Sequence, residues 1–255
     1  MRLFTQELVK LAGQSATLAL ALTALGVGAV LTLFGGVTFL AEPERAGDVA
    51  QITGLYTDTV YLAWIFPPIL GIVSMTGEFR FGTAVQTFLQ TPKRGVVLAT
   101  KMLAMAVGGL VIATASLAGA YLTAWIVGLL AGDPASPEAG RFFGATVALL
   151  AAGAVLGPLG VAVGALIRSQ LPALAIFLGW VLLLEQILAG LLGPAGSYLP
   201  GSLIPRAMSL DLSPAGLDIA LAGALTPLTA IVYLALQAVM LAIVANVTTL
   251  RRDID

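Results

Sequence analysis

Cysteine and histidine are both missing from this sequence of 255 residues. Without them the chain has no disulfide, no thiol nucleophile, no zinc cluster and no imidazole-based catalytic triad. Charge is also scarce, because only 10% of the residues are Asp, Glu, Lys or Arg, against about 25% in soluble domains. The net charge of -1 provides no basic surface for nucleic acid. These absences exclude most hydrolases and disfavour nucleic-acid binding.

Apolar side chains are what the sequence has in excess. They make up 59% of the residues and raise the mean hydropathy to +1.01, so polar residues are too few to cover a soluble surface. Crossing a bilayer takes about 20 helical residues, and apolar runs without period-two alternation favour helices over a barrel. We therefore predict an all-α integral membrane protein with one transmembrane domain, 1–255, whose six spans are 15–40, 59–76, 102–130, 142–167, 171–192 and 220–250.

The basic residues are distributed unevenly between the two sides of this predicted bundle. Cytoplasmic loops retain Lys and Arg during insertion, so nine basic residues on the N-terminal side and three on the other predict that both termini are cytoplasmic. The first span is too long for a signal-peptide core. We expect a multi-pass protein of the bacterial inner membrane. The nine are Arg2, Lys10, Arg80, Lys93, Arg94, Lys101, Arg168, Arg251 and Arg252, and the three are Arg45, Arg141 and Arg206.

Two amphipathic segments are predicted on the cytoplasmic side. Residues 1–14 place Phe4, Leu8 and Leu11 on one helical face, which favours an interfacial helix over a frayed extension of the first span. Residues 77–100 join the second and third spans and are longer than a turn between helices requires. By its chemistry alone, this second segment either lies on lipid headgroups or binds a partner.

The segment 77–100 also contains a pattern found in a known family. Glu78, Gly82 and Thr83, followed by Pro92 and Arg94, resemble the motif of ABC-2 type ABC transporter permeases. The six spans, the N-terminal amphipathic helix and the external excursion before the last span are similar to that family as well. The resemblance implies that the segment is a cytoplasmic coupling helix that contacts an ATPase. The residues it assigns to coupling are Glu78, Arg80, Gly82, Thr83, Pro92 and Arg94.

The same resemblance implies that the chemistry belongs to partner chains. No Gly-x-x-x-x-Gly-Lys-Ser/Thr sequence is present, so the chain has no Walker-type phosphate loop of its own. We expect two copies of an ABC ATP-binding subunit, which would bind ATP and Mg²⁺, and a second permease copy, identical or paralogous. The chain itself is expected to contact membrane lipid, to need no cofactor or metal, to catalyse no reaction and to bind no nucleic acid.

One acidic residue, Glu185, lies inside a predicted span. Ionisable side chains at that depth are expensive to bury and are candidate functional residues. Three interpretations stay open: a structural or gating carboxyl, a contact for a polar or cationic substrate, and a proton-coupling group. The other candidates for a substrate pathway or gate are Trp180, Gln186 and Tyr198.

Glycine and proline predict two further features. Gly153, Gly157, Gly160 and Gly164 share one helical face, which favours a packing seam over a substrate groove. Residues 193–219 contain four prolines among apolar side chains, too interrupted for a span and too apolar for a free loop. We predict an external re-entrant segment between spans five and six that caps the pathway. A hairpin resting on lipid is the alternative.

The favoured hypothesis is the permease subunit of an ATP-driven exporter for a hydrophobic or amphipathic small molecule, such as a drug, an antibiotic or a lipid-like compound. The main alternative is an ion-coupled secondary transporter that uses Glu185, although no inverted repeat is evident. A membrane anchor or assembly factor without transport activity is a third possibility. An intramembrane protease is disfavoured because the predicted spans contain neither His nor Asp.

Overall fold

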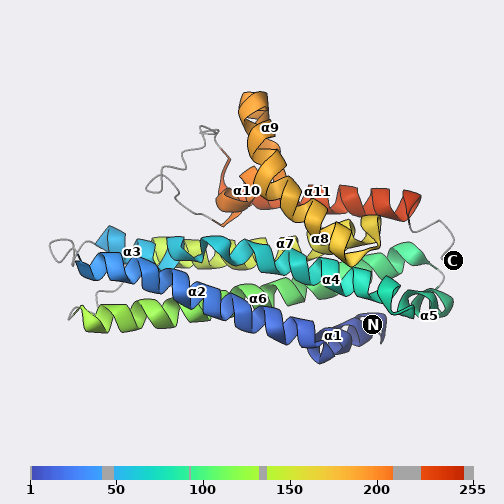
Figure 1. The fold of residues 1–255 in the computed structure, drawn as a ribbon, viewed down its shortest axis with the longest axis horizontal. Helices are drawn as coiled ribbons and strands as arrows, with labels where there is room; N and C mark the ends of the chain where they lie inside the picture. The colour runs from blue at the N-terminus through green and yellow to red at the C-terminus, as the bar shows by residue number, and fades with distance from the viewer. Residues whose placement is uncertain (1, 42–48, 92, 132–136, 209–224, 250–255) are drawn as a thin grey trace.

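The structure is a computed structural model that describes residues 2–41, 49–91, 93–131, 137–208 and 225–249. Within these ranges every regular element is a helix (Figure 1). Six helical runs are long and apolar enough to cross a membrane. The coarse fold class predicted from the sequence, an all-α protein with six candidate spans, is therefore confirmed.

Four spans are single helices and two are composite. The single helices are α2 (Ser15–Ala41), α6 (Arg94–Leu130), α7 (Ala139–Ile167) and α11 (Pro227–Thr248). The second span joins α3 (Val49–Thr57), the 3-10 helix η2 (Asp58–Ile65) and α4 (Phe66–Arg80). The fifth joins α8 (Gln170–Gly179), the π-helical turn η3 (Trp180–Leu184), α9 (Glu185–Leu192) and the 3-10 helix η4 (Gly193–Tyr198). Outside the spans lie α1 (Arg2–Gly13), α5 (Thr83–Gln90) and α10 (Pro200–Ala207).

Several helices extend beyond or begin inside the ranges predicted from the sequence. The predicted limits beside Glu78 and Lys101 followed the positions of these charges, but both charges are paired in the structure, so α4 and α6 continue through them. The last helix begins at Pro227, after Thr226 accepts a hydrogen bond from the backbone N–H of Thr229 at 3.3 Å. An N-cap followed by proline is a typical helix start. Residues 220–224 and 250 of the predicted sixth span lie outside the described residues.

The first and last helices reach the same end of the bundle. α1, α5 and the C-terminal end of α11 gather there, whereas α3 lies at the opposite end (Figure 1). We call the end that contains α1, α5 and the C-terminal end of α11 the α5 end. This arrangement follows from an even number of spans, as predicted from the distribution of basic residues.

α7 is the central helix of the bundle, and it contacts α4, α6 and α11. α2 packs mainly on α6 and leaves much of its apolar surface uncovered; Leu18, Leu22 and Phe34 are 64%, 59% and 70% exposed. A helix that is apolar on all sides and largely unpacked within its own chain is suited to contact lipid.

The glycine face predicted on α7 is a packing seam between three helices. A Cβ atom at Gly157 would lie 2.1 Å from the backbone oxygen of Met105 on α6. One at Gly160 would lie 2.1 Å from the backbone oxygen of Pro68 on α4. Gly153 and Gly164 also face these two helices, through Gly109 and Met75. The prediction of a seam is confirmed: the backbones approach each other too closely for any side chain.

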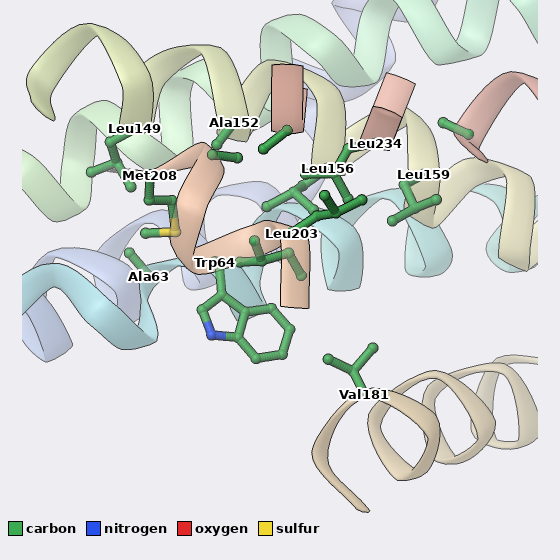
Figure 2. Packing of buried hydrophobic residues seen from close by; sticks show 14 of the residues in the cluster. Ala63, Trp64, Leu149, Ala152, Leu156, Leu159, Val181, Leu203, Met208 and Leu234 are labelled. Atoms are coloured by element: carbon green, nitrogen blue, oxygen red, sulfur yellow. The ribbon is translucent and has the colours of Figure 1, made fainter. Parts of the chain in front are cut away.

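The described part of the predicted external segment, residues 193–208, is packed into the protein core. Leu203, Ile204 and Met208 are at most 1% exposed and belong to the largest hydrophobic cluster. Figure 2 shows Leu203 and Met208 close to α7, on the same side as Trp64 of η2. These contacts disagree with a hairpin that merely rests on lipid. Residues 209–219 of the predicted segment lie outside the described residues.

Candidate functional site

The short helix α5 is the main feature of the α5 end. α4 ends at Arg80, and Gly82 then adopts a left-handed conformation with φ of 68° before α5 begins at Thr83. Glycine adopts this conformation without the strain that a Cβ atom would add. Thr91 is extended, and α6 begins at Arg94. α5 is therefore a separate helix that connects the second and third spans, within the segment 77–100 that the sequence analysis predicts to be amphipathic.

One side of α5 is held by the bundle and another is open. Ala84 is 1% exposed, whereas Leu89 is 79% exposed, and Phe81 in the turn before α5 is 74% exposed. The guanidinium of Arg80 lies 5.5 Å from the Phe81 ring centroid, within the range of a cation–π contact. The predicted residues Gly82 and Thr83 are exposed, and Arg94 is half-buried. Pro92 lies outside the described residues.

Beneath α5, four charged side chains form a closed ring that we call the ion ring: Glu7 and Lys10 of α1, Glu78 of α4 and Lys101 of α6. The Lys101 Nζ lies 2.8 Å from Glu7 Oε2 and 2.8 Å from Glu78 Oε1. The Lys10 Nζ lies 2.6 Å from Glu7 Oε1 and 3.1 Å from Glu78 Oε1. Two acids and two bases alternate around the ring, so its formal charge is zero.

Three members of the ion ring are almost completely buried. Lys101, Glu7 and Glu78 are 1%, 2% and 7% exposed. Burial of an ion costs several kcal/mol, which is repaid only when each charge is paired with good geometry. Removal of any one buried member would leave an unmatched charge. The ring therefore holds α1 against the helices on both sides of α5.

The position of Glu78 differs from that expected of a residue that contacts a partner. Its carboxylate faces Lys101 and Lys10 inside the chain rather than the exposed surface of α5. Neither Glu7 nor Lys101 was among the residues that the sequence assigned to coupling. The signal for Glu7 was its place on the apolar face of α1, between Phe4, Leu8 and Leu11, where an acid needs a buried partner.

Both α1 members of the ion ring have shifted pKa values. Burial alone would raise the pKa of Glu7, but Lys101 and Lys10 outweigh it and hold that pKa below its usual 4.5. Burial alone would lower the pKa of Lys10, but Glu7 and Glu78 outweigh it and raise that pKa above 10.5. Glu7 thus stabilises the fold above pH 4.5 and loses this effect as the pH falls through its folded pKa. Lys10 stabilises below pH 10.5 and loses this effect as the pH rises through its folded pKa.

We expect the thermal stability of the protein in nanodiscs to depend on Glu7 in acid. Below pH 4.5 the free energy of unfolding should fall, by at most about 1.4 kcal/mol per pH unit for this group. A series of melting curves between pH 3 and pH 7 measures how steeply the stability falls in acid, and this fall should be shallower in Glu7→Gln. The exposed Glu138 provides the control, because Glu138→Gln should lose stability in acid as steeply as the wild type does. An equally steep loss of stability in acid for wild type and Glu7→Gln would contradict the role of Glu7 in the ion ring.

Glu185 connects the fifth span to α10. It is 0% exposed, and its Oε1 accepts a hydrogen bond of 2.9 Å from the backbone N–H of Ser202. A Cβ atom at Gly201 would lie 2.9 Å from the same oxygen, so the carboxyl packs directly on the first turn of α10. No side chain of the preceding residue caps this helix. The Glu185 side chain therefore caps the N-terminus of α10 from another helix, in place of a side chain at the N-cap residue Leu199, and the helix dipole favours a carboxylate there.

The other pathway candidates do not form one site with Glu185. Trp180 and Tyr198 are 38% and 47% exposed, and Gln186 is exposed too. The Tyr198 ring packs edge-on against Tyr233 at 5.1 Å between centroids. Of the three, only the Trp180 indole faces the Glu185 carboxyl. The Glu185 Oε2 has no hydrogen-bond partner among the described residues. This arrangement favours the structural interpretation of Glu185.

Removal of the Glu185 carboxyl should destabilise α10 through the loss of its cap. Glu185→Ala leaves the buried Ser202 N–H without an acceptor, and we expect a loss of about 1–3 kcal/mol in the free energy of unfolding. Glu185→Gln keeps an amide oxygen at this position and should lose less than half of that. Gln186→Ala, at the exposed neighbouring position, is the control. Thermal unfolding in nanodiscs measures all three, and a loss as large in Gln as in Ala would show that the charge, not the cap, matters.

The six spans indicate a multi-pass α-helical membrane protein. The described residues contain no group of three or more acidic side chains that could hold a metal ion. Neither a scan against protein-family models nor a search of curated proteins found a match for this chain.

Proposed function

We propose that this protein is the transmembrane subunit of an ATP-driven exporter of the ABC-2 type, in the inner membrane of a bacterium. The α5 end is then cytoplasmic, since α1, α5 and the ends of α4 and α6 bring together Lys10, Arg80, Lys93 and Arg94. α5 is the coupling helix. In this proposal, two ATP-binding subunits supply ATP and Mg²⁺, and a second copy or a paralogue completes the permease.

The observation that supports this proposal most is the exposed apolar surface of α5 outside the bundle. Leu89 lies on α5 and Phe81 on the turn that precedes it, and both side chains are exposed in the connection between the second and third spans. Exposed apolar side chains at the end of a membrane protein mark an interaction site. A groove on the ATP-binding subunit is the partner that would cover them.

The ion ring gives α5 a way to move other helices. Glu78 precedes α5 by five residues, and Lys101 follows on the next span. Because Lys101 binds both Glu78 and Glu7, a displacement of α5 would reach α1 and the second and third spans together. Within the proposal, ATP-driven closure of the partner subunits is transmitted through this connection.

The proposed cargo is a hydrophobic or amphipathic small molecule that leaves the cytoplasm or the inner leaflet. The surroundings of Glu185 argue against the alternative, an ion-coupled secondary transporter. This carboxyl caps α10 and forms no ion pair with the described residues. Ion-coupled transporters usually place such acids beside a second ionisable group or an ion pathway.

Purification of the tagged chain from its native membrane in mild detergent tests the proposal. Mass spectrometry should identify a bound soluble protein with a Walker A sequence. Leu89→Asp should reduce its recovery at least about tenfold, which corresponds to about 1.4 kcal/mol in binding free energy. Leu130→Asp is the matched control, because Leu130 is 72% exposed on α6 at the opposite end of the bundle. Transport without any ATPase, abolished when the proton gradient is dissipated, would contradict the proposal.

A further inference from the structure

A cavity of about 380 Å³ lies on the side of the bundle where the fifth span leaves it. Its walls come from four parts of the chain: Val163 on α7, Phe177 and Trp180 on the fifth span, Pro200 on α10 and Met240 on α11. The π-helical turn η3 begins at Trp180, and beyond it α9 points away from the other helices (Figure 1). The space is therefore formed by the path of the fifth span within one chain.

The wall of this cavity is apolar almost throughout. Gln237 is the one lining residue with a polar side chain other than Trp180. Its Nε2 donates a 2.7 Å hydrogen bond to the backbone oxygen of Tyr198, and its Oε1 is buried without a hydrogen-bond partner among the described residues. The Trp180 indole faces the Glu185 carboxyl. The surface that these residues present to the cavity is therefore almost entirely apolar, because the Gln237 Oε1 is itself buried.

The depth of the cavity identifies what can fill it. Ile176 and Val181, which line it, are six and eleven residues after Gln170, the first residue of the fifth span. At 1.5 Å per residue they lie about 9 to 17 Å along the span from its first residue, a position within the hydrocarbon core. Water gains no hydrogen bonds there, and an engineered apolar cavity of about 150 Å³ in another protein stays dry and binds benzene.

An empty space of this size would leave its lining atoms without dispersion contacts. Lipid tails are the material that surrounds the protein at this depth. We propose that the cavity binds one acyl chain of a bilayer phospholipid, held between the fifth span and α7 and α11. The headgroup stays outside, because the surface of the cavity is almost entirely apolar. This inference goes beyond the proposed export function and does not depend on an ATP-binding subunit.

Photolabelling of the full chain in nanodiscs tests the site without any partner. The probe is a phosphatidylcholine with a diazirine in the middle of one acyl chain, diluted into unlabelled phospholipid. Peptide mapping should find labels on the lining residues of the fifth span and α11 at least about five times more often than on the exposed face of α2. Native mass spectrometry of the solubilised protein should show one retained phospholipid.

Substitutions that fill the cavity provide the decisive comparison. Val163→Phe should reduce labelling of the lining residues to the level on α2 and abolish the retained phospholipid. Val147→Phe makes the same change on the same helix at a position that is 64% exposed, and it should leave both signals within about twofold of wild type. Met240→Trp, at a lining position that is 65% exposed, blocks the cavity without altering the core should Val163→Phe fail to fold.

Three results would overturn the proposal. The first is uniform labelling of all exposed helix faces with no retained phospholipid. The second is unchanged labelling in a folded Val163→Phe or Met240→Trp variant. The third is a cross-link from these positions to a second copy of the chain, which would mean that protein rather than lipid covers the cavity. None of these results would bear on whether α5 binds an ATP-binding subunit.

Discussion

Lys101→Met should destabilise the protein by about 3–5 kcal/mol, because it leaves two buried glutamates facing a single lysine. Lys101 is 1% exposed and bonds Glu7 and Glu78 from two other helices. The single charge of Lys10 can neutralise only one of the two carboxylates that it contacts. The excess negative charge should release α1. Thermal unfolding in nanodiscs measures the loss, and hydrogen exchange of α1 peptides should become markedly faster.

Two comparisons separate the effect of the ion ring from that of a lost lysine. Lys93→Met removes an exposed lysine near the same end and should change stability by no more than about 0.5 kcal/mol. Adding Glu78→Gln to Lys101→Met restores equal numbers of acids and bases, so it should recover more than half of the loss. If the two effects were simply additive, the charges would not act as one unit.

Gly157→Ala should be about as damaging as the loss of a charge in the ion ring, although it adds only a methyl group. The new Cβ atom would lie 2.1 Å from the backbone oxygen of Met105, and neither backbone can yield without separating α6 and α7. Overpacking typically costs about 1–3 kcal/mol and more where the neighbour is rigid. We expect a loss of at least about 3 kcal/mol, or failure to fold, in thermal unfolding and size-exclusion assays.

Gly144→Ala is the matched control, since Gly144 lies on the same helix with no atom within 4 Å of the added Cβ. This change should stabilise α7 slightly, because alanine forms helix better than glycine by up to about 1 kcal/mol. Similar melting temperatures for the two variants would mean that the close contact along the seam is not needed.

The six spans and the glycine seam could be predicted from the sequence because each depends on local patterns. Long apolar runs need no knowledge of neighbouring helices. Gly153, Gly157, Gly160 and Gly164 share a face through helical periodicity alone. What could not be predicted was which helices this face contacts, because Met105 and Pro68 are brought there by the tertiary fold.

The ion ring and the cap on α10 depend on contacts between distant parts of the chain. Glu7 and Lys101 are 94 residues apart, so no spacing rule connects them. Treating charges as span limits placed Lys101 at the start of a helix, although it lies inside α6 and is neutralised by its partners. Glu185 stood out in the sequence as an acid inside a span, but its partner is the backbone of Ser202, which leaves no signal in the side-chain pattern.

The central proposal is that α5 binds an ATP-binding subunit. Since the chain has no cysteine, Leu89→Cys places a single thiol on the exposed face of α5, and maleimide-benzophenone can be attached there in native membranes. Leu130→Cys is the control at the other end. Photolysis should link Leu89→Cys, but not Leu130→Cys, to a soluble protein with a Walker A sequence. Cross-links from Leu89→Cys to lipid alone would contradict the account and leave α5 as a helix at the membrane surface.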